Sequence, residues 1–321
     1  MQSRKLIEEV DNYILTVQAL IALGEHLKIE HSANYFLGKK MKTSTVNTIT
    51  PNEDVTPDEV IQLDTSNGMI VEAKKSFSKT HTHESMEKCF EQMKKYDDDL
   101  IGWNTENEKI DNHEISILTQ ISRSRELSEF IESKISTQPF HRVYNIIEFA
   151  RNDQTRFFIF LRHFLSNSRY NHSKLKNGVD IWLEHLQPMI SDIKFYDAEP
   201  PILYIMIILW QNVFGSIATD EQLEESRGKK IIRLVVNVND LLNKLKTFSL
   251  QSNGNHDVPS VKSVKEAMET FEKIGLASKI DDNKYDVKFH RIKVRNLIEH
   301  FAEKMCSGGQ LTLENILSRS E

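Results

Sequence analysis

The sequence is poor in the two residues that most often interrupt helices and strands. Its 321 residues include only 11 glycines and 7 prolines, roughly half the usual combined share. This scarcity excludes collagen-like and loop-dominated folds and favours a helix-rich chain. The sequence also has only two cysteines, Cys89 and Cys306. Two cysteines exclude a disulfide framework and a four-cysteine zinc site, and they are typical of a reducing compartment.

Long apolar runs and an excess of positive charge are also missing. The most apolar run, residues 202–210, is too short to span a bilayer, and the first ten residues lack the apolar core of a signal peptide. We therefore expect a cytoplasmic protein without a membrane segment. The 47 acidic residues outnumber the 41 lysines and arginines, for a net charge of −6. This balance argues against a wholly basic wrapper of nucleic acid but allows local basic patches.

The pattern of apolar residues predicts a mixed α/β first half. Helical spacing alternates there with short β-branched runs. The expected helices cover 4–27, 29–41, 83–96 and 122–135, and the expected strands cover 43–50, 60–63, 69–73, 115–119, 143–149 and 157–161. This order predicts a mixed central sheet with helices on its faces.

The second half is mainly helical by the same criteria. The expected helices cover 200–216, 230–248, 261–275 and 291–305, and two short strands cover 277–280 and 284–289. A helix that leads into such a hairpin resembles the end of a winged-helix domain, here about 228–305. The length predicts two domains, which we place at 1–168 and 169–321.

One segment, TPDEVIQLDTSNGMIVEAKKS, combines strand patterns with charged residues. Residues 64–68 are strong turn formers, so 58–75 is predicted to be a β-hairpin. If Leu63 lies opposite Met69, Asp58 faces Lys74. Because strand side chains alternate, Asp58, Glu72 and Lys74 then project from one face. Two carboxylates beside an ammonium suit a hard divalent cation, and the lysine is placed to orient or deprotonate a metal-bound water.

These residues resemble the signature of the PD-(D/E)XK nuclease superfamily. The signature appears as Pro57-Asp58, thirteen further residues, and then Glu72-Ala73-Lys74. The resemblance implies a restriction-endonuclease-like fold, whose core is a helix, a three-strand meander, a helix and another strand. It implies that Asp58, Glu72 and the Ala73 carbonyl bind Mg²⁺ or Mn²⁺. It also implies that Lys74 positions the attacking water and stabilises developing charge.

Two further features extend the resemblance. Gln92 and Tyr96 are four residues apart, so they share one face of the expected helix. Such a pair is typical of the RecB-like branch of the superfamily, where it flanks and organises the active site. The family also often has a glutamate on its first core helix that tunes the metal. We assign this position to Glu30, with Glu25 as the alternative.

Two charged segments lie outside this signature. A stretch near the C-terminus has five basic residues and one acid, Asp286; the basic residues are Lys284, Lys288, Arg291, Lys293 and Arg295. On a wing and the following helix they are expected to contact nucleic-acid phosphates, although winged-helix modules also serve only for packing or dimerisation. The run Asp97-Asp98-Asp99 is expected to be a solvated helix end.

The sequence as a whole predicts a metal-dependent nuclease. DNA is the expected substrate, Mg²⁺ or Mn²⁺ the expected cofactor, and a homodimer is compatible with cutting both strands. Two alternatives stay open. In the first, the chain is a catalytically inactive, nuclease-like protein that binds DNA. In the second, the C-terminal region serves protein–protein interaction.

Overall fold

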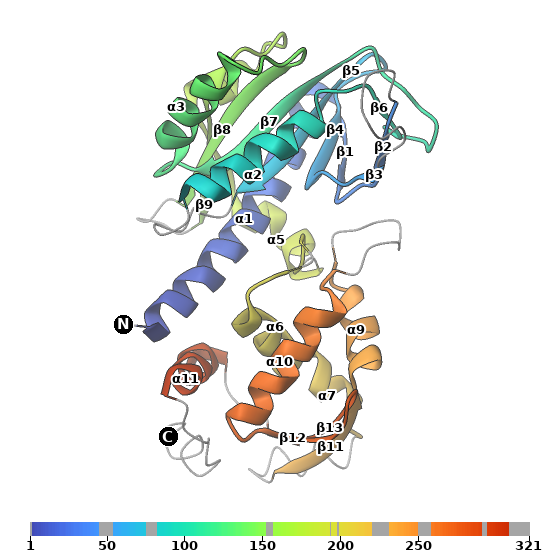
Figure 1. Ribbon diagram of the computed structural model, residues 1–321, viewed down its shortest axis with the longest axis vertical. Coiled ribbons are helices and arrows are strands. Elements are labelled where there is room, and N and C mark those ends of the chain that lie inside the picture. Colours follow the sequence, from blue (N-terminus) through green and yellow to red (C-terminus); the bar gives the residue numbers. More distant parts are fainter. Residues whose placement is uncertain are drawn as a thin grey trace. The chain divides into compact units, whose positions relative to one another are not determined.

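The computed structural model describes residues 2–44, 54–74, 82–151, 157–192, 194–197, 199–219, 231–249, 258–290 and 294–307. The chain forms two compact units. The sheet unit comprises Ile14–Tyr196 and Leu250–Gly254, and the C-terminal unit comprises Met1–Tyr13, Asp197–Ser249 and Asn255–Glu321. Both units contain helices and strands (Figure 1), so the predicted mixed α/β class is confirmed.

The sheet unit is built on a mixed sheet of seven strands in the order β1-β4-β5-β7-β8-β9-β10. The two pairs β5–β7 and β7–β8 are parallel, and the other neighbours are antiparallel. The strands are β1 (Asn34–Leu37), β4 (Glu59–Gln62), β5 (Asn67–Lys74), β7 (Asn112–Gln120), β8 (Val143–Arg151), β9 (Phe158–Ser166) and β10 (Val179–Trp182). A smaller sheet joins β3 (Asp54–Val55), β2 (Met41–Thr43) and β6 (Leu100–Ile101).

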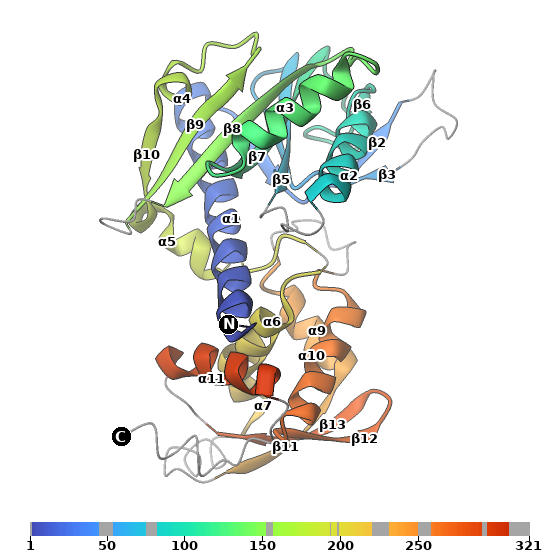
Figure 2. The same cartoon turned by 60° about the vertical axis from the view of Figure 1, so that its left-hand side comes forward.

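Helices α2 (Thr82–Lys95) and α3 (Ser124–Ile135) cover one face of the large sheet (Figures 1 and 2). Each helix connects two parallel neighbours, β5 with β7 and β7 with β8. Right-handed crossovers that proceed in the same direction place their helices on the same face. Apolar side chains of both helices pack against the strands in one core, which includes Ile70, Met86, Met93, Ile115, Ile117, Leu127, Ile131 and Ile146.

The long helix α1 (Gln2–His31) contributes its later turns to the opposite face (Figure 2). Gly24 lies where this helix contacts β1 and β4 of the sheet. A Cβ atom at Gly24 would lie 2.4 Å from Glu59 Oε1 and 2.6 Å from Tyr35 Cδ2. Gly24 therefore does not interrupt the helix; it allows the helix to approach β1 and β4.

We expect the substitution Gly24→Ala to destabilise the sheet unit by about 1–3 kcal/mol, the usual cost of overpacking. The gain in helix propensity, about 1 kcal/mol, offsets only part of this cost. Urea unfolding measures the difference. The matched control is Gly215→Ala, because Gly215 also lies in a helix and its added Cβ would meet only Phe289 Cζ, at 4.0 Å. Equal stability changes in both variants would contradict the close approach at Gly24.

The C-terminal unit has a core of aromatic side chains. Trp210, Phe214, Phe271, Phe289 and Phe301 pack with ring centroids 5.3–6.1 Å apart. They come from η1 (Leu209–Val213), α7 (Phe214–Ile217), α10 (Val261–Lys273), β13 (Lys284–Phe289) and α11 (Val294–Ser307). The other elements are α4 (Ser173–Asn177) and α5 (Leu183–Asp192) of the sheet unit, and α6 (Ile202–Ile208), β11 (Ile232–Asn237), α9 (Val238–Lys246) and β12 (Ala277–Asp281) of the C-terminal unit.

Two helix predictions were wrong. The chain leaves α1 after His31 and forms β1 and β2, so 29–41 is not a second helix. Residues 232–237 form β11, whose alternate residues are buried, and only α9 of the expected helix 230–248 is helical. Strand β1 pairs with β4, and strand β11 pairs with β13. These partners are distant in the chain, and local spacing does not reveal such pairing. Most of the expected strand 43–50 lies outside the described residues.

The division of the chain falls later than the predicted boundary at 168. Strand β10 pairs with β9 and extends the large sheet to Trp182, so the sheet unit continues to Tyr196. Among the described residues, no helix combines the length and the apolar character needed to cross a membrane.

Candidate active site

The hairpin β4–β5 brings the predicted site residues to one face of the sheet. Its register pairs Ile61 with Met69, two residues away from the predicted pairing of Leu63 with Met69. The reason is a tighter turn. Leu63 N donates to Asn67 O at 2.9 Å, and the Asp64 carboxylate accepts from Ser66 N at 2.7 Å. A shift of two residues keeps every side chain on its predicted face. Continued by one pair, the register sets Asp58 opposite Glu72 rather than Lys74.

Glu72 is the centre of the cluster. Its side chain is only 6% exposed, and each carboxylate oxygen accepts one hydrogen bond. Lys74 Nζ donates to Oε1 at 2.8 Å, and the Tyr96 hydroxyl donates to Oε2 at 2.9 Å. Gln92 Nε2 in turn donates to the Tyr96 hydroxyl at 3.0 Å. Tyr96, directly after the end of α2, thus holds the carboxylate from one side, and Lys74 of the same strand holds it from the other.

Asp58 lies directly before the neighbouring strand β4. Its Oδ2 atom accepts a hydrogen bond from Ala73 N at 2.7 Å, and its main-chain oxygen accepts from Gly38 N at 2.8 Å. These two bonds fix both the backbone and the carboxylate of Asp58 beside β5. Asp58, Glu72 and the peptide of Ala73 are therefore brought together.

The charges of the cluster reinforce one another. Burial disfavours the ammonium of Lys74, but the carboxylates of Glu72 and Asp58 outweigh this effect and raise the pKa of Lys74 above its usual value. Burial and the same two carboxylates hold the pKa of Tyr96 well above its ordinary range. At neutral pH Lys74 is therefore a charged donor and Tyr96 a neutral donor to Glu72.

Cys89 is buried close to this cluster. Burial raises the pKa of its thiol to about 12, against the opposing effect of Lys74. The thiolate is the reactive form of cysteine, so this residue serves packing in the core rather than chemistry.

The donors at the cluster fit a hard divalent cation. Among the described residues, no group of three or more His, Cys, Asp or Glu side chains is arranged to hold a metal ion. Mg²⁺, however, commonly binds through one or two carboxylates with water completing its shell. Asp58, Glu72 and the Ala73 carbonyl offer only oxygen atoms, and a carboxylate has about four lone-pair positions. The two hydrogen bonds at Glu72 leave room for such a ligand.

A cavity of about 550 Å³ lies beside Gln92 and Tyr96. It runs between α2 and the residues that precede Pro57. Its charged lining residues are Asp54, Glu84, Glu87, Lys88, Glu91 and Lys95. Four carboxylates against two lysines make this cavity acidic, so cations are favoured there and bare phosphates are not.

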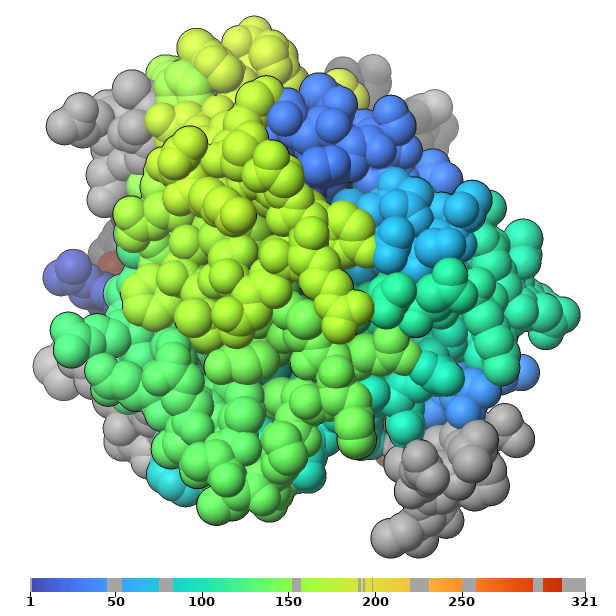
Figure 3. Space-filling view, turned by 90° about the horizontal axis from the view of Figure 1, so that it is seen from above, coloured from blue at the N-terminus to red at the C-terminus, as the bar shows by residue number. Residues whose placement is uncertain are grey.

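The structure does not bring Glu30 or Glu25 to this cluster. Both lie on α1, which covers the face opposite Glu72. Glu30 forms an ion pair with Lys174 of α4, which lies beside the end of α1 (Figure 3). Glu25 accepts from the Tyr35 hydroxyl at 2.7 Å and pairs with Lys28. The assignment of Glu30 to the site is therefore corrected: sequence proximity to the first strand did not place it at the site.

Only part of the predicted basic stripe can be located. Lys284 is exposed, with Nζ 4.0 Å from an Asp281 carboxylate oxygen, and Lys288 Nζ is 3.4 Å from Gly275 O. Both lie on β13, on the side away from its buried residues. Arg291 and Lys293, and the side chain of Arg295, lie outside the described residues.

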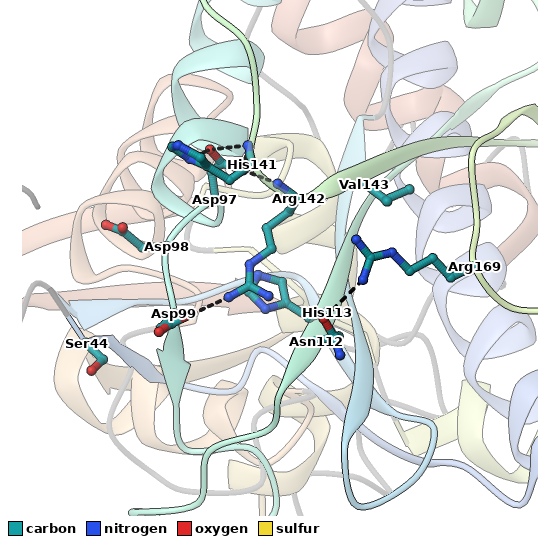
Figure 4. A pocket seen from close by; sticks show the side chains of 10 residues that line it. All are labelled: Ser44, Asp97, Asp98, Asp99, Asn112, His113, His141, Arg142, Val143 and Arg169. Atoms are coloured by element: carbon teal, nitrogen blue, oxygen red, sulfur yellow. Dashed lines mark hydrogen bonds and ion pairs between the residues drawn. The ribbon is translucent and has the colours of Figure 1, made fainter. Parts of the chain in front are cut away.

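The run Asp97–Asp99 was expected to be a solvated helix end. In the structure it follows α2 and lines a second cavity, of about 470 Å³ (Figure 4). Asp97 accepts from the backbone of His141 and Arg142, and the Arg142 guanidinium pairs with Asp99. This cavity lies at the amino ends of β7 and β8, where Asn112 and Val143 begin the strands. Lys74 ends β5 at the opposite end, so the cavity is separate from the cluster around Glu72.

Sequence reasoning missed a polar pair on β8 and β9. Glu148, 1% exposed, accepts from Arg162 Nε at 2.7 Å and from the Ser124 hydroxyl at 2.7 Å. A signal was present in the sequence. Glu148 is the one charged residue of the apolar run 143–149, and a buried charge there requires partners.

We expect Tyr96→Phe to weaken the site without dismantling it. The substitution removes the donor to Glu72 Oε2, and loss of such a supporting hydrogen bond typically costs about 10- to 100-fold in metal affinity or activity. Titration with Mn²⁺, followed by electron paramagnetic resonance, should show weaker binding of the ion. Tyr144→Phe, which alters a half-buried tyrosine of the same core, is the control. An unchanged Mn²⁺ affinity in Tyr96→Phe would contradict this role.

Comparison with known proteins adds no relative: the chain matches no family model, no curated protein and no solved structure.

Proposed function

We propose that this protein is a metal-dependent nuclease that hydrolyses phosphodiester bonds in DNA. The observation that carries the proposal is the convergence of Asp58, Glu72 and Lys74 on one face of the β4–β5 hairpin. Asp58 and Glu72 meet there although thirteen residues separate them in the sequence. The Tyr96 hydroxyl donates to Glu72, and Gln92 donates to that hydroxyl. A surface ion pair alone does not require this second layer of buried donors.

Each residue has a role in the proposed reaction. Asp58, Glu72 and the Ala73 carbonyl hold Mg²⁺ or Mn²⁺. When bound, the ion lowers the pKa of water and stabilises charge on the phosphate. Lys74 orients the attacking water and donates toward the charge that develops on the phosphate oxygens. Tyr96 and Gln92 keep the Glu72 carboxylate in place.

The order of elements supports a restriction-endonuclease-like core. The first helix is α1, the antiparallel strands β1, β4 and β5 lie side by side, and α2 leads to the parallel strand β7. Apart from β2, β3 and β6 of the smaller sheet, this is the order that the resemblance implies: helix, three-strand meander, helix and strand.

The C-terminal unit supports a nucleic-acid-binding or partner-binding role. Strand β11 is followed by α9, α10 and the hairpin β12–β13, in a sheet of order β11-β13-β12, as in winged-helix modules. We propose that the stripe from Lys284 to Arg295 contacts phosphates, and that the protein acts in the cytoplasm, with a homodimer as the form that cuts both strands.

The test is cleavage of circular and linear DNA in the presence of Mg²⁺, Mn²⁺ or EDTA. The proposal predicts cleavage with either ion and none with EDTA. Nicking of circles identifies an endonuclease, and digestion of linear DNA alone identifies an exonuclease. No cleavage of DNA under any of these conditions would contradict the proposal.

A second candidate function is DNA binding without cleavage by a protein that keeps the nuclease-like core. The observation in its favour is that both oxygens of Glu72 already have hydrogen-bond partners, Lys74 and Tyr96. This candidate predicts duplex binding that weakens steeply with salt, and no cleavage at any metal concentration.

A further inference from the structure

A row of polar residues continues from Lys74 across the sheet. The register pairs Lys74 with Thr119, Thr119 with Glu148, and Glu148 with Arg162. Laterally paired residues of a sheet point to the same face. The row therefore extends the face that carries Asp58 and Glu72 over β7, β8 and β9.

Thr119, next to Lys74, has an unused hydroxyl. The residue is completely buried, and its Oγ1 atom has no hydrogen-bond partner in the described part of the chain. A buried hydroxyl without a partner costs free energy, about 1–3 kcal/mol. Native proteins keep such groups mainly where strain, function or an additional bound group explains them.

Glu148 serves to hold an arginine. Its Oε1 atom accepts from both Nε and a terminal nitrogen of Arg162, and its Oε2 atom accepts from the Ser124 hydroxyl at 2.7 Å. Both oxygens are thus occupied, and the carboxylate is almost fully buried. The plane of the Arg162 guanidinium is fixed by this arrangement.

Arg162 remains open to solvent despite this pairing. Its side chain is 42% exposed, and it lies over the Phe160 ring, 5.8 Å from the ring centroid. A guanidinium has five N–H donors in a rigid fork that matches phosphate geometry. Two of its nitrogens are bonded to Glu148, so the fork keeps donors for a further anion.

We propose that Arg162 binds a phosphate of the substrate strand close to, but distinct from, the phosphate that is cleaved. The inference rests on the proposed nuclease function. Three strand spacings separate Arg162 from Lys74, about 14 Å between the strand backbones, so one phosphate does not contact both side chains. The Thr119 hydroxyl lies between them in the row. Glu148 is then a positioning residue that acts through Arg162.

The test compares Arg162→Ala and Arg162→Lys with wild type by two measurements. One is the binding of a fluorescent DNA oligonucleotide, by anisotropy in EDTA at several salt concentrations; the other is the kinetics of Mg²⁺-dependent cleavage. For Arg162→Ala we expect KM to rise about tenfold while kcat changes less than about threefold, because the contact is lost in ground state and transition state alike. The slope of log K against log salt should fall by about 0.7–0.9.

Arg162→Lys keeps the charge but not the fork. It should restore the salt slope with an affinity still below that of wild type. If Arg162→Ala does not fold, this variant alone tests the contact, and wild-type affinity in it would overturn the proposal. The control is Arg125→Ala, which removes an exposed arginine of α3 that pairs with Glu129; KM and slope should stay unchanged.

The outcomes separate this inference from the proposed function. A wild-type protein that cleaves DNA, together with an Arg162→Ala variant of unchanged KM and salt slope, would overturn the role of Arg162 only. A fall in kcat alone, without a change in binding, would also overturn it. A wild-type protein that neither binds nor cleaves DNA would overturn both.

Discussion

Asp58→Asn and Lys74→Met are each expected to lower the proposed Mg²⁺-dependent cleavage of DNA by at least about a hundredfold, the loss typical of removing one preorganised stabilising group. Asp58→Asn keeps an oxygen that accepts from Ala73 N but removes the negative charge that attracts the metal. Lys74→Met keeps most of the apolar stem and removes the ammonium beside Glu72. Cleavage rates at saturating DNA measure the effect.

The control for these variants is Lys28→Met. Lys28 also pairs with a glutamate, Glu25, but on the helix that covers the other face of the sheet. It should leave the rate unchanged, and circular dichroism should show all three variants folded. Full activity in both Asp58→Asn and Lys74→Met would exclude the cluster as the catalytic centre.

Glu59→Met is expected to stabilise the protein by about 1–3 kcal/mol at pH 8, the cost of a buried polar group without a partner. Glu59 is completely buried, and neither carboxylate oxygen has a hydrogen-bond partner in the described part of the chain. Burial, and secondarily Asp58, raises the pKa of Glu59 well above its usual value. An apolar side chain of similar volume avoids this penalty.

The pH dependence of this effect has a definite sign. A carboxyl whose pKa is raised in the folded state binds its proton more tightly there than in the unfolded chain. Its contribution to stability is therefore greatest below the unfolded pKa, about 4.3, and is lost as the pH rises toward the folded pKa. Urea unfolding at pH 5 and pH 8 should show a larger gain for Glu59→Met at pH 8. Glu129→Met, at an exposed site on α3, is the control. A gain independent of pH would contradict the raised pKa of the buried Glu59 carboxyl.

The sequence predicted the face of the site better than its pairing. Strand alternation set Asp58, Glu72 and Lys74 on one side. This prediction survives the change in pairing, because a shift of two residues leaves every side chain on the same face of the sheet. It did not predict which residue faces Asp58, since the Asp64 side chain closes a tighter turn than the one assumed. Helical spacing likewise placed Gln92 beside Tyr96, which the structure confirms.

The remaining differences arise from contacts between distant segments. Glu30 was assigned by its nearness to the first strand, but α1 packs on the face of the sheet opposite Glu72, where Gly24 lies against Glu59 and Tyr35. The pairing of Glu148 with Arg162 depends on the antiparallel register of β8 and β9, which includes a bulge. Glu148 stands out locally as the one charged residue of an apolar run, but neither its partner nor the face that α1 covers has a local signature.

The most direct test of the central claim, that Asp58 and Glu72 form one cation site, needs no substrate. Electron paramagnetic resonance measures free Mn²⁺ during titration of the wild type, Asp58→Asn, Glu72→Gln and the control Glu129→Gln. The account predicts saturable Mn²⁺ uptake by the wild type and the control, and its loss in each of the two site variants. Equal uptake by all four proteins, or none by the wild type, would contradict it.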